Sequence, residues 1–133
     1  MQNYFMRSKM NIKKPWITVI FLSLTILPNC GSLKSVPDEL LGTWTTQAQE
    51  YQGIFLELNH KTIGFGKQDG SVDSYTIVKI KSRKMKGDWV RYTIFYRDHQ
   101  LKKYEFPLLY NPYKYGIVRF LNKEQYTWIR EST

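Results

Sequence analysis

The side chains that most often carry catalysis or bind metals are few in this chain and far apart. The two histidines, His60 and His99, lie in separate stretches with turn character. Neither has a cysteine, a second histidine or a carboxylate nearby at the spacing of a metal site. Asp69, Asp73 and Asp88 are typical of turns and strand ends rather than of a catalytic acid pair. The sequence therefore predicts no metal, no cofactor and no catalytic centre, and we expect the protein not to be an enzyme.

One cysteine, Cys30, stands where the leader of an exported protein would end. A basic stretch over residues 10–14 precedes an uncharged stretch over residues 16–27. The second stretch is shorter than the ~20 apolar residues that a membrane-spanning helix needs, and it fits the apolar region of a signal peptide. An exported chain with a single cysteine has no internal disulfide partner for it, so Cys30 is either a free thiol or a modified one.

The residues around this position, Leu27-Pro28-Asn29-Cys30, resemble a lipobox, the sequence at which bacterial lipoproteins are cleaved and lipidated. Leu27 matches the usual leucine three positions before the cysteine, whereas Pro28 and Asn29 depart from the usual small residues. The resemblance implies that residues 1–29 are a lipoprotein signal peptide. It also implies that Cys30 carries a palmitate-type lipid through which the protein is attached to a membrane.

The same resemblance predicts a location in the cell envelope. Gly31 follows the cysteine in place of Asp, and by analogy with diderm bacteria this favours the outer membrane. The inner membrane and secretion are the alternatives. An uncleaved N-terminal anchor and an ordinary signal peptide are the alternatives to a lipoprotein leader. The candidate start codons are Met1, Met6 and Met10.

Charge restricts the partners further. The chain carries 20 Lys and Arg against 11 Asp and Glu, a net charge of +9. Four of the bases lie in residues 1–29, so the remainder has sixteen bases, eleven acids and a charge near +5. A moderately basic exported protein suits anionic surfaces such as phospholipid or lipopolysaccharide headgroups. Nucleic acid is not expected as a partner.

After a predicted polar tether over residues 30–39, residues 40–131 show the pattern of an all-β domain. Short apolar and aromatic segments alternate with turn residues, and no segment keeps a helical period. Asp69-Gly70 is a hairpin signal, and a change of face in one strand suggests a bulge. Pro107 suggests an unpaired or bulged position. The predicted strands cover 42–47, 53–58, 62–66, 72–81, 88–97, 101–109, 115–121 and 125–130.

Eight consecutive strands with tight turns predict a small antiparallel up-and-down barrel, because closure removes the two open edges of a sheet. A two-layer sandwich is the alternative. Leu41-Gly42-Thr43-Trp44 near the start and Tyr126-Thr127-Trp128-Ile129-Arg130 near the end resemble the lipocalin-like, or calycin, barrels. The resemblance implies that Trp44 packs across the closed end of the barrel and that Arg130 lies over it as a structural partner. It also implies a small apolar or amphipathic ligand, or a lipid, inside the barrel.

Two groups of side chains are candidates for binding. Aromatic residues on alternating strand positions either line a cavity or fill the barrel; these are Tyr92, Tyr96, Tyr104, Phe106 and Phe120. A basic run either contacts anionic headgroups or an acidic partner, or is a solvated strand end that discourages aggregation; it comprises Lys79, Lys81, Arg83, Lys84 and Lys86. The sequence thus leaves two functions open. In the first, an envelope lipoprotein carries a small apolar or amphipathic ligand, or a lipid, inside its barrel. In the second, the barrel is filled and acts as a non-enzymatic interaction or inhibitor module for an envelope protein.

Overall fold

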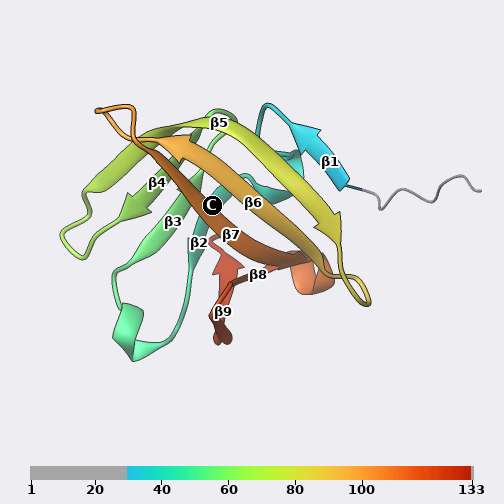
Figure 1. The fold of residues 1–133 in the computed structure, drawn as a ribbon. Coiled ribbons are helices and arrows are strands. Elements are labelled where there is room, and N and C mark those ends of the chain that lie inside the picture. Colours follow the sequence, from blue (N-terminus) through green and yellow to red (C-terminus); the bar gives the residue numbers. More distant parts are fainter. Residues whose placement is uncertain (1–29, 133) are drawn as a thin grey trace, which may run out of the picture.

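The strand pattern of the sequence gives rise to a closed β-barrel in the computed structural model, which describes residues 30–132. One sheet has the order β1-β5-β4-β3-β2-β9-β8-β7-β6, and a further pairing of β5 with β6 closes it (Figure 1). Every pairing is antiparallel. The strands are β1 (Cys30–Leu33), β2 (Gly42–Thr45), β3 (Phe55–Leu58), β4 (Thr62–Gly66), β5 (Val72–Lys84), β6 (Val90–Arg97), β7 (Lys103–Asn111), β8 (Ile117–Phe120) and β9 (Lys123–Arg130).

Strands β2 to β9 form the predicted eight-stranded up-and-down barrel, which excludes the two-layer sandwich. The predicted strand at 62–66 coincides with β4. The expected bulge is present as a register shift between Ile77 and Lys79 in the β5–β6 ladder. Hydrogen bonds from Gly70 N to the Lys67 carbonyl and from Lys67 N to the Ser71 carbonyl close the hairpin at Asp69-Gly70.

Pro107 lies inside β7 and is in register with Thr93 of β6, but on its β8 side it lies outside the ladder, in agreement with the expected unpaired position. Its carbonyl accepts a 3.4 Å hydrogen bond from Leu121 N, so this edge of the residue faces the β8 side. The β7–β8 ladder runs only from Leu108 to Asn111. The missing proline N–H therefore falls just beyond the ladder, where a strand proline is tolerated.

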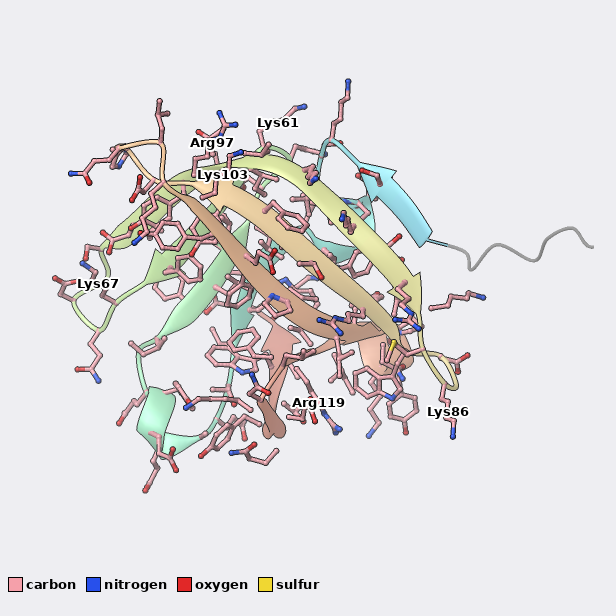
Figure 2. The ribbon with its side chains drawn as sticks, viewed as in Figure 1. Lys61, Lys67, Lys86, Arg97, Lys103 and Arg119 are labelled. Atoms are coloured by element: carbon pink, nitrogen blue, oxygen red, sulfur yellow. The ribbon has the colours of Figure 1, made fainter. Side chains whose placement is uncertain are left out.

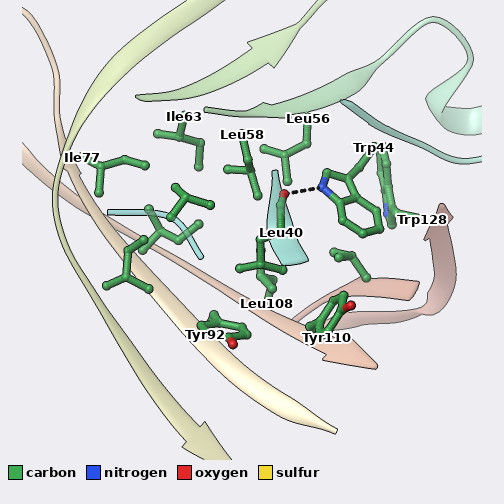
Figure 3. Close-up of a cluster of buried hydrophobic side chains, with 14 residues drawn as sticks. Leu40, Trp44, Leu56, Leu58, Ile63, Ile77, Tyr92, Leu108, Tyr110 and Trp128 are labelled. Atoms are coloured by element: carbon green, nitrogen blue, oxygen red, sulfur yellow. Dashed lines mark hydrogen bonds between the residues drawn. The ribbon is translucent and has the colours of Figure 1, made fainter. Parts of the chain in front are cut away.

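The interior of the barrel is packed with apolar side chains from every barrel strand, as Figure 3 shows. Trp44 is completely buried, and its Nε1 donates a 2.9 Å hydrogen bond to the Leu40 carbonyl. Trp128 is 1% exposed. The buried hydrophobic residues are Val36, Leu40, Trp44, Leu56, Leu58, Ile63, Ile77, Ile80, Tyr92, Ile94, Leu108, Tyr110, Val118 and Trp128. The barrel and its core thus lie wholly within residues 36–130.

Residues 30–39, expected to be a free polar tether, are part of the folded unit. β1 adds to the edge of β5 beyond the point where the β4 ladder ends. Val36 is 1% exposed, and its N–H donates a 3.0 Å hydrogen bond to the His60 carbonyl. The 3₁₀ helix η2 (Asp38–Leu40) then places Leu40 in the core. The apolar side chains of Val36 and Leu40 explain the difference, since burying them favours folding of a segment that is otherwise polar.

The remaining short helices are the 3₁₀ turns η3 (Gln49–Tyr51) and η4 (Tyr113–Tyr115). Within residues 30–132, no helix combines the length and the apolar character that crossing a membrane requires.

Gly66 on β4 offers a test of packing on the outer wall. It is opposite Phe55 of β3, and a Cβ added at Gly66 would lie 2.2 Å from two atoms of the Phe55 ring. We expect Gly66→Ala to lower the free energy of unfolding by about 1–3 kcal/mol, because overpacking forces side chains and backbone to shift. Denaturant unfolding followed by circular dichroism measures the change.

A double-mutant cycle supplies the control for this prediction. In a Phe55→Ala background the ring is absent, so Gly66→Ala is expected to cost much less. An equal cost in both backgrounds would show that the Phe55 ring is not the reason for glycine at this position.

Candidate functional site

The predicted cavity-lining aromatic residues fall into two groups, with Tyr92 apart from the other four. Tyr92 is 6% exposed and packs edge-on against Tyr110, on the side of the core that Leu40 and Trp44 occupy. Its hydroxyl donates a hydrogen bond to the Glu39 carboxylate. Burial, followed by this hydrogen bond, raises the pKa of Tyr92 well above its usual range. Tyr92 therefore supports the fold as a neutral group at neutral pH.

The other predicted lining residues belong to a chain of ring contacts. Tyr96 stacks on Tyr104 with 5.4 Å between ring centroids. Phe106 meets Phe120 edge-on at 5.0 Å, and Phe120 stacks on Trp128 at 4.5 Å. Further contacts extend the chain to Tyr51, Phe65, Tyr75, His99 and Tyr126. These rings occupy the end of the barrel that carries the β2–β3, β4–β5, β6–β7 and β8–β9 connections, and contacts between the rings fill that end.

Trp44 and Arg130 are brought together at the opposite end. Arg130 Cζ lies 4.9 Å from the Trp44 ring centroid, and the two residues are in register in the β2–β9 ladder. Arg130 Nη2 also donates to the Glu39 carbonyl. A guanidinium over an indole face is a favourable cation–π contact, which here joins the last strand to the first barrel strand. These contacts give both residues a role in holding the barrel together.

Five pockets on the described part of the chain lie on its outer wall and rim, and no buried core residue lines any of these five. One hollow of about 310 Å³ lies at the β5–β6 turn and the adjacent wall; its lining is Met85, Lys86, Trp89, Leu109, Arg119 and Glu124. A second hollow of about 150 Å³ lies between β5 and β6; its lining is Lys81, Ser82, Arg83, Arg91 and Thr93. We call these the apolar hollow and the cationic hollow. Both hollows thus lie on the outside of the barrel.

Both hollows belong to a basic outer face formed by β5, β6, β7 and β8. Inward residues such as Ile80, Ile94, Leu108 and Val118 are buried, so the residues that alternate with them face outward. Figure 2 shows Arg97 and Lys103 close to one another on neighbouring strands. We define the basic outer face by its cations, which are Lys79, Lys81, Arg83, Arg91, Arg97, Lys103 and Arg119.

The predicted basic run divides between this face and the hairpin that follows it. Lys79 and Lys81 point outward on β5, with their Nζ atoms 5.0 and 5.4 Å from the Phe95 ring centroid. Arg83 lies farther along the same strand. Lys84 ends β5, and Lys86 lies in the β5–β6 turn, where Figure 2 labels it. Lys79, Lys81 and Arg83 thus contribute to the basic outer face, whereas Lys84 and Lys86 border it.

Sequence reasoning missed four members of this face, which are Arg91, Arg97, Lys103 and Arg119. Arg91 is in register with Arg83 on one side and with Leu109 on the other, and Leu109 is in register with Arg119. Arg119 Cζ lies 5.0 Å from the Trp89 ring centroid. The alternation of β6 already placed Arg91 outward, and a count across the β5–β6 turn would have placed it opposite Arg83.

Acidic partners are scarce on the basic outer face. The ion pairs found within residues 31–132 are Lys67 with Asp73 at 2.9 Å and His60 with Asp38 at 3.6 Å, and both lie elsewhere. Glu105 faces outward from β7, but it is in register with Phe95 rather than with a base, and Glu124 lines the apolar hollow beside Arg119 without an ion pair to it. Among these residues no three His, Cys, Asp or Glu side chains come close enough to hold a metal ion. The face thus presents largely unneutralised positive charge.

The register of β1 connects this face with the predicted lipidation site. Cys30 is in register with Arg83, and Ser32 is in register with Lys81. In Figure 1 β1 lies alongside the last part of β5. The backbone of Cys30 thus lies opposite that of Arg83, which lines the cationic hollow.

Comparison of the chain with protein-family models, with curated proteins and with solved structures finds no match. The geometry is that of a small eight-stranded antiparallel barrel, which is consistent with a calycin-like fold.

Proposed function

We propose that the chain is an exported lipoprotein, attached to the cell envelope through a lipid on Cys30, with a filled barrel that acts as a non-enzymatic binding module. Its working surface in this proposal is the basic outer face, and its partner is an anionic component of the envelope. The outer membrane is the proposed location, and the lipobox-like residues before Cys30 support the anchor.

The observation that carries this proposal is the contrast between the packed interior and the charged exterior. The core is filled by Trp44, Trp128 and the apolar side chains around them, and the hollows found are on the outer wall and rim. The cationic hollow brings Lys81, Arg83 and Arg91 together without an ion pair to an acid among residues 31–132. A surface of this kind attracts anionic partners and orients them.

A carrier of a small apolar or amphipathic ligand is the second candidate, and two observations favour it. Several rings at the far end of the barrel, including Phe65, Tyr96, Phe106 and Phe120, are only partly buried. Trp128 Nε1 is buried and has no acceptor among the described residues. A ligand that displaced some of these rings and offered an acceptor would satisfy that donor.

Mass spectrometry of the full chain produced in a bacterial envelope separates the two functions and tests the anchor. After denaturation, we expect the mass of residues 30–133 plus one lipid modification. Under native conditions we expect that same mass with no further ligand. A stoichiometric extra mass that is lost on denaturation would instead identify a carrier and would weigh its ligand.

The matched control is the full-length Cys30→Ser variant, which is expected to carry no lipid and to keep residues 1–29. If the variant and the natural chain have the same processing and the same lack of lipid, the anchor proposal is wrong, whatever the native mass shows about the barrel.

A further inference from the structure

The cationic hollow has the composition of an anion site. Its lining combines three cations, Lys81, Arg83 and Arg91, with the polar residues Ser82 and Thr93. At about 150 Å³ it is small, so it suits a compact charged group rather than an extended molecule. These side chains come from two adjacent strands of the closed barrel, and the sheet therefore fixes the positions of their backbones.

The pairing across the hollow is unfavourable unless an anion is present. Arg83 and Arg91 are directly opposite one another in the β5–β6 ladder, and like charges in this position repel. No acid lines the hollow. The nearest outward acid on β7 by register, Glu105, is opposite Phe95, which is separated from Arg91 by four positions along β6. An external anion would convert the repulsion into two attractive contacts.

The chemistry of the side chains selects among anions. A guanidinium presents a planar fork of N–H donors that matches the oxygens of a phosphate, and charge-assisted bonds of this kind are among the strongest. A hydroxyl such as that of Thr93 adds a neutral donor. Three cations exceed what one carboxylate neutralises, whereas a phosphate offers more oxygens to share among them.

The surroundings of the hollow point to a phosphate that carries an apolar group. Arg91 is opposite Leu109, which lines the apolar hollow together with Met85 and Trp89. Met85 is 42% exposed. An indole and a thioether beside a row of cations are typical of a surface that rests at the boundary between headgroups and acyl chains. Cys30, in register with Arg83, is at the same edge.

We infer that Lys81, Arg83 and Arg91 form a binding site for the phosphate of an anionic membrane lipid, and that the site turns the β5–β6 hairpin and its neighbouring wall toward the membrane. This inference deepens the proposed function, since it names the partner of the basic outer face and rests on that function for the source of the phosphate. The phosphate chemistry itself depends only on the hollow.

The test compares three variants of residues 30–133 that also carry Cys30→Ser, so that no anchor contributes. Arg83→Gln with Arg91→Gln removes the fork-shaped donors. Arg83→Lys with Arg91→Lys keeps the charge but removes the fork. Lys61→Gln with Lys102→Gln is the matched control, because it removes the same charge from two exposed turns. Unfolding curves check that each variant is folded. We expect this because the four substituted side chains, at positions 61, 83, 91 and 102, lie on the outside of the barrel.

Binding is measured by sedimentation with phosphatidylcholine vesicles that contain phosphatidylglycerol. We expect the glutamine pair at Arg83 and Arg91 to weaken binding about tenfold or more, given roughly fivefold for each base near an anionic surface. The lysine pair should also weaken it several-fold, whereas the control pair should change it about twofold or less. If the control pair weakened vesicle binding as much as the glutamine pair does, the site proposal would be wrong. Binding would then come from diffuse electrostatic attraction to the whole basic surface.

The second measurement is a titration with inorganic phosphate. Its binding is monitored by the NMR signals of the Nε groups of Arg83 and Arg91. Tight binding of phosphate without a preference for anionic vesicles would overturn the lipid source. Binding of neither probe would overturn the site as a whole. Either result leaves the mass of the lipid-modified chain unchanged, so failure of this inference is distinguishable from failure of the proposed anchor.

Discussion

Trp44→Ala is expected to lower the free energy of unfolding by about 3–5 kcal/mol, the usual cost of truncating a large buried aromatic residue. Trp44 is completely buried, packs edge-on against Tyr110, and supports the Arg130 guanidinium on its ring. Its loss would also leave the buried Leu40 carbonyl without the 2.9 Å hydrogen bond from Nε1. The cavity and the unpaired carbonyl both lie where the first and last barrel strands meet.

Denaturant unfolding followed by far-ultraviolet circular dichroism measures this loss. Tyr115→Ala is the control, since Tyr115 is 94% exposed and its truncation should change stability by no more than about 0.5 kcal/mol. Trp44→Phe should fall between the two, because it keeps a ring but removes the Nε1 donor. A loss below about 1 kcal/mol for Trp44→Ala would contradict the central place given to this residue in the core.

Removal of residues 30–40 is expected to abolish cooperative folding of the barrel. The deletion removes the fully buried Leu40 and the nearly buried Val36, and each such aliphatic truncation alone costs about 2–5 kcal/mol for Leu or somewhat less for Val. It also removes the Glu39 carbonyl that Arg130 contacts and the carboxylate that Tyr92 contacts. The sum approaches the whole stability of a small domain, about 5–15 kcal/mol.

The comparison is between chains that begin at residue 30, at residue 36 and at residue 41. The chain from residue 36 loses β1 but keeps Val36 and Leu40, so it should fold with reduced stability. Only the chain from residue 41 should lack a sigmoidal unfolding transition. Full stability of that shortest chain would restore the tether interpretation of residues 30–39.

The fold was largely predictable because its signals are local. Strand alternation, the Asp69-Gly70 turn and the bulge near Val78 each depend on a few neighbouring residues. The Trp44 and Arg130 motifs were recognised through a resemblance, and the structure places the two side chains in contact. Residues 30–39 were misjudged because their overall polarity hid Val36 and Leu40, whose burial depends on the distant core.

The candidate site was only half predictable from the chain. The run from Lys79 to Lys86 is visible as five bases within eight residues, but Arg91 gains its importance from the strand register that places it opposite Arg83. Arg119 is still farther along the chain and reaches the same face through two more ladders. Cys30 lies beside this face only because β1 pairs with β5.

The sequence by itself determined the strand pattern, the turns, the excess of positive charge and the lipobox-like residues before Cys30, because each of these is encoded by residue type at short spacing. Only the tertiary structure decided that the barrel is filled. Alternation shows which side chains face inward, but the space they share depends on how the closed sheet brings rings from different strands into contact. The tertiary structure also decided which cations share one hollow, because register across the ladders, rather than distance along the chain, sets which side chains are neighbours.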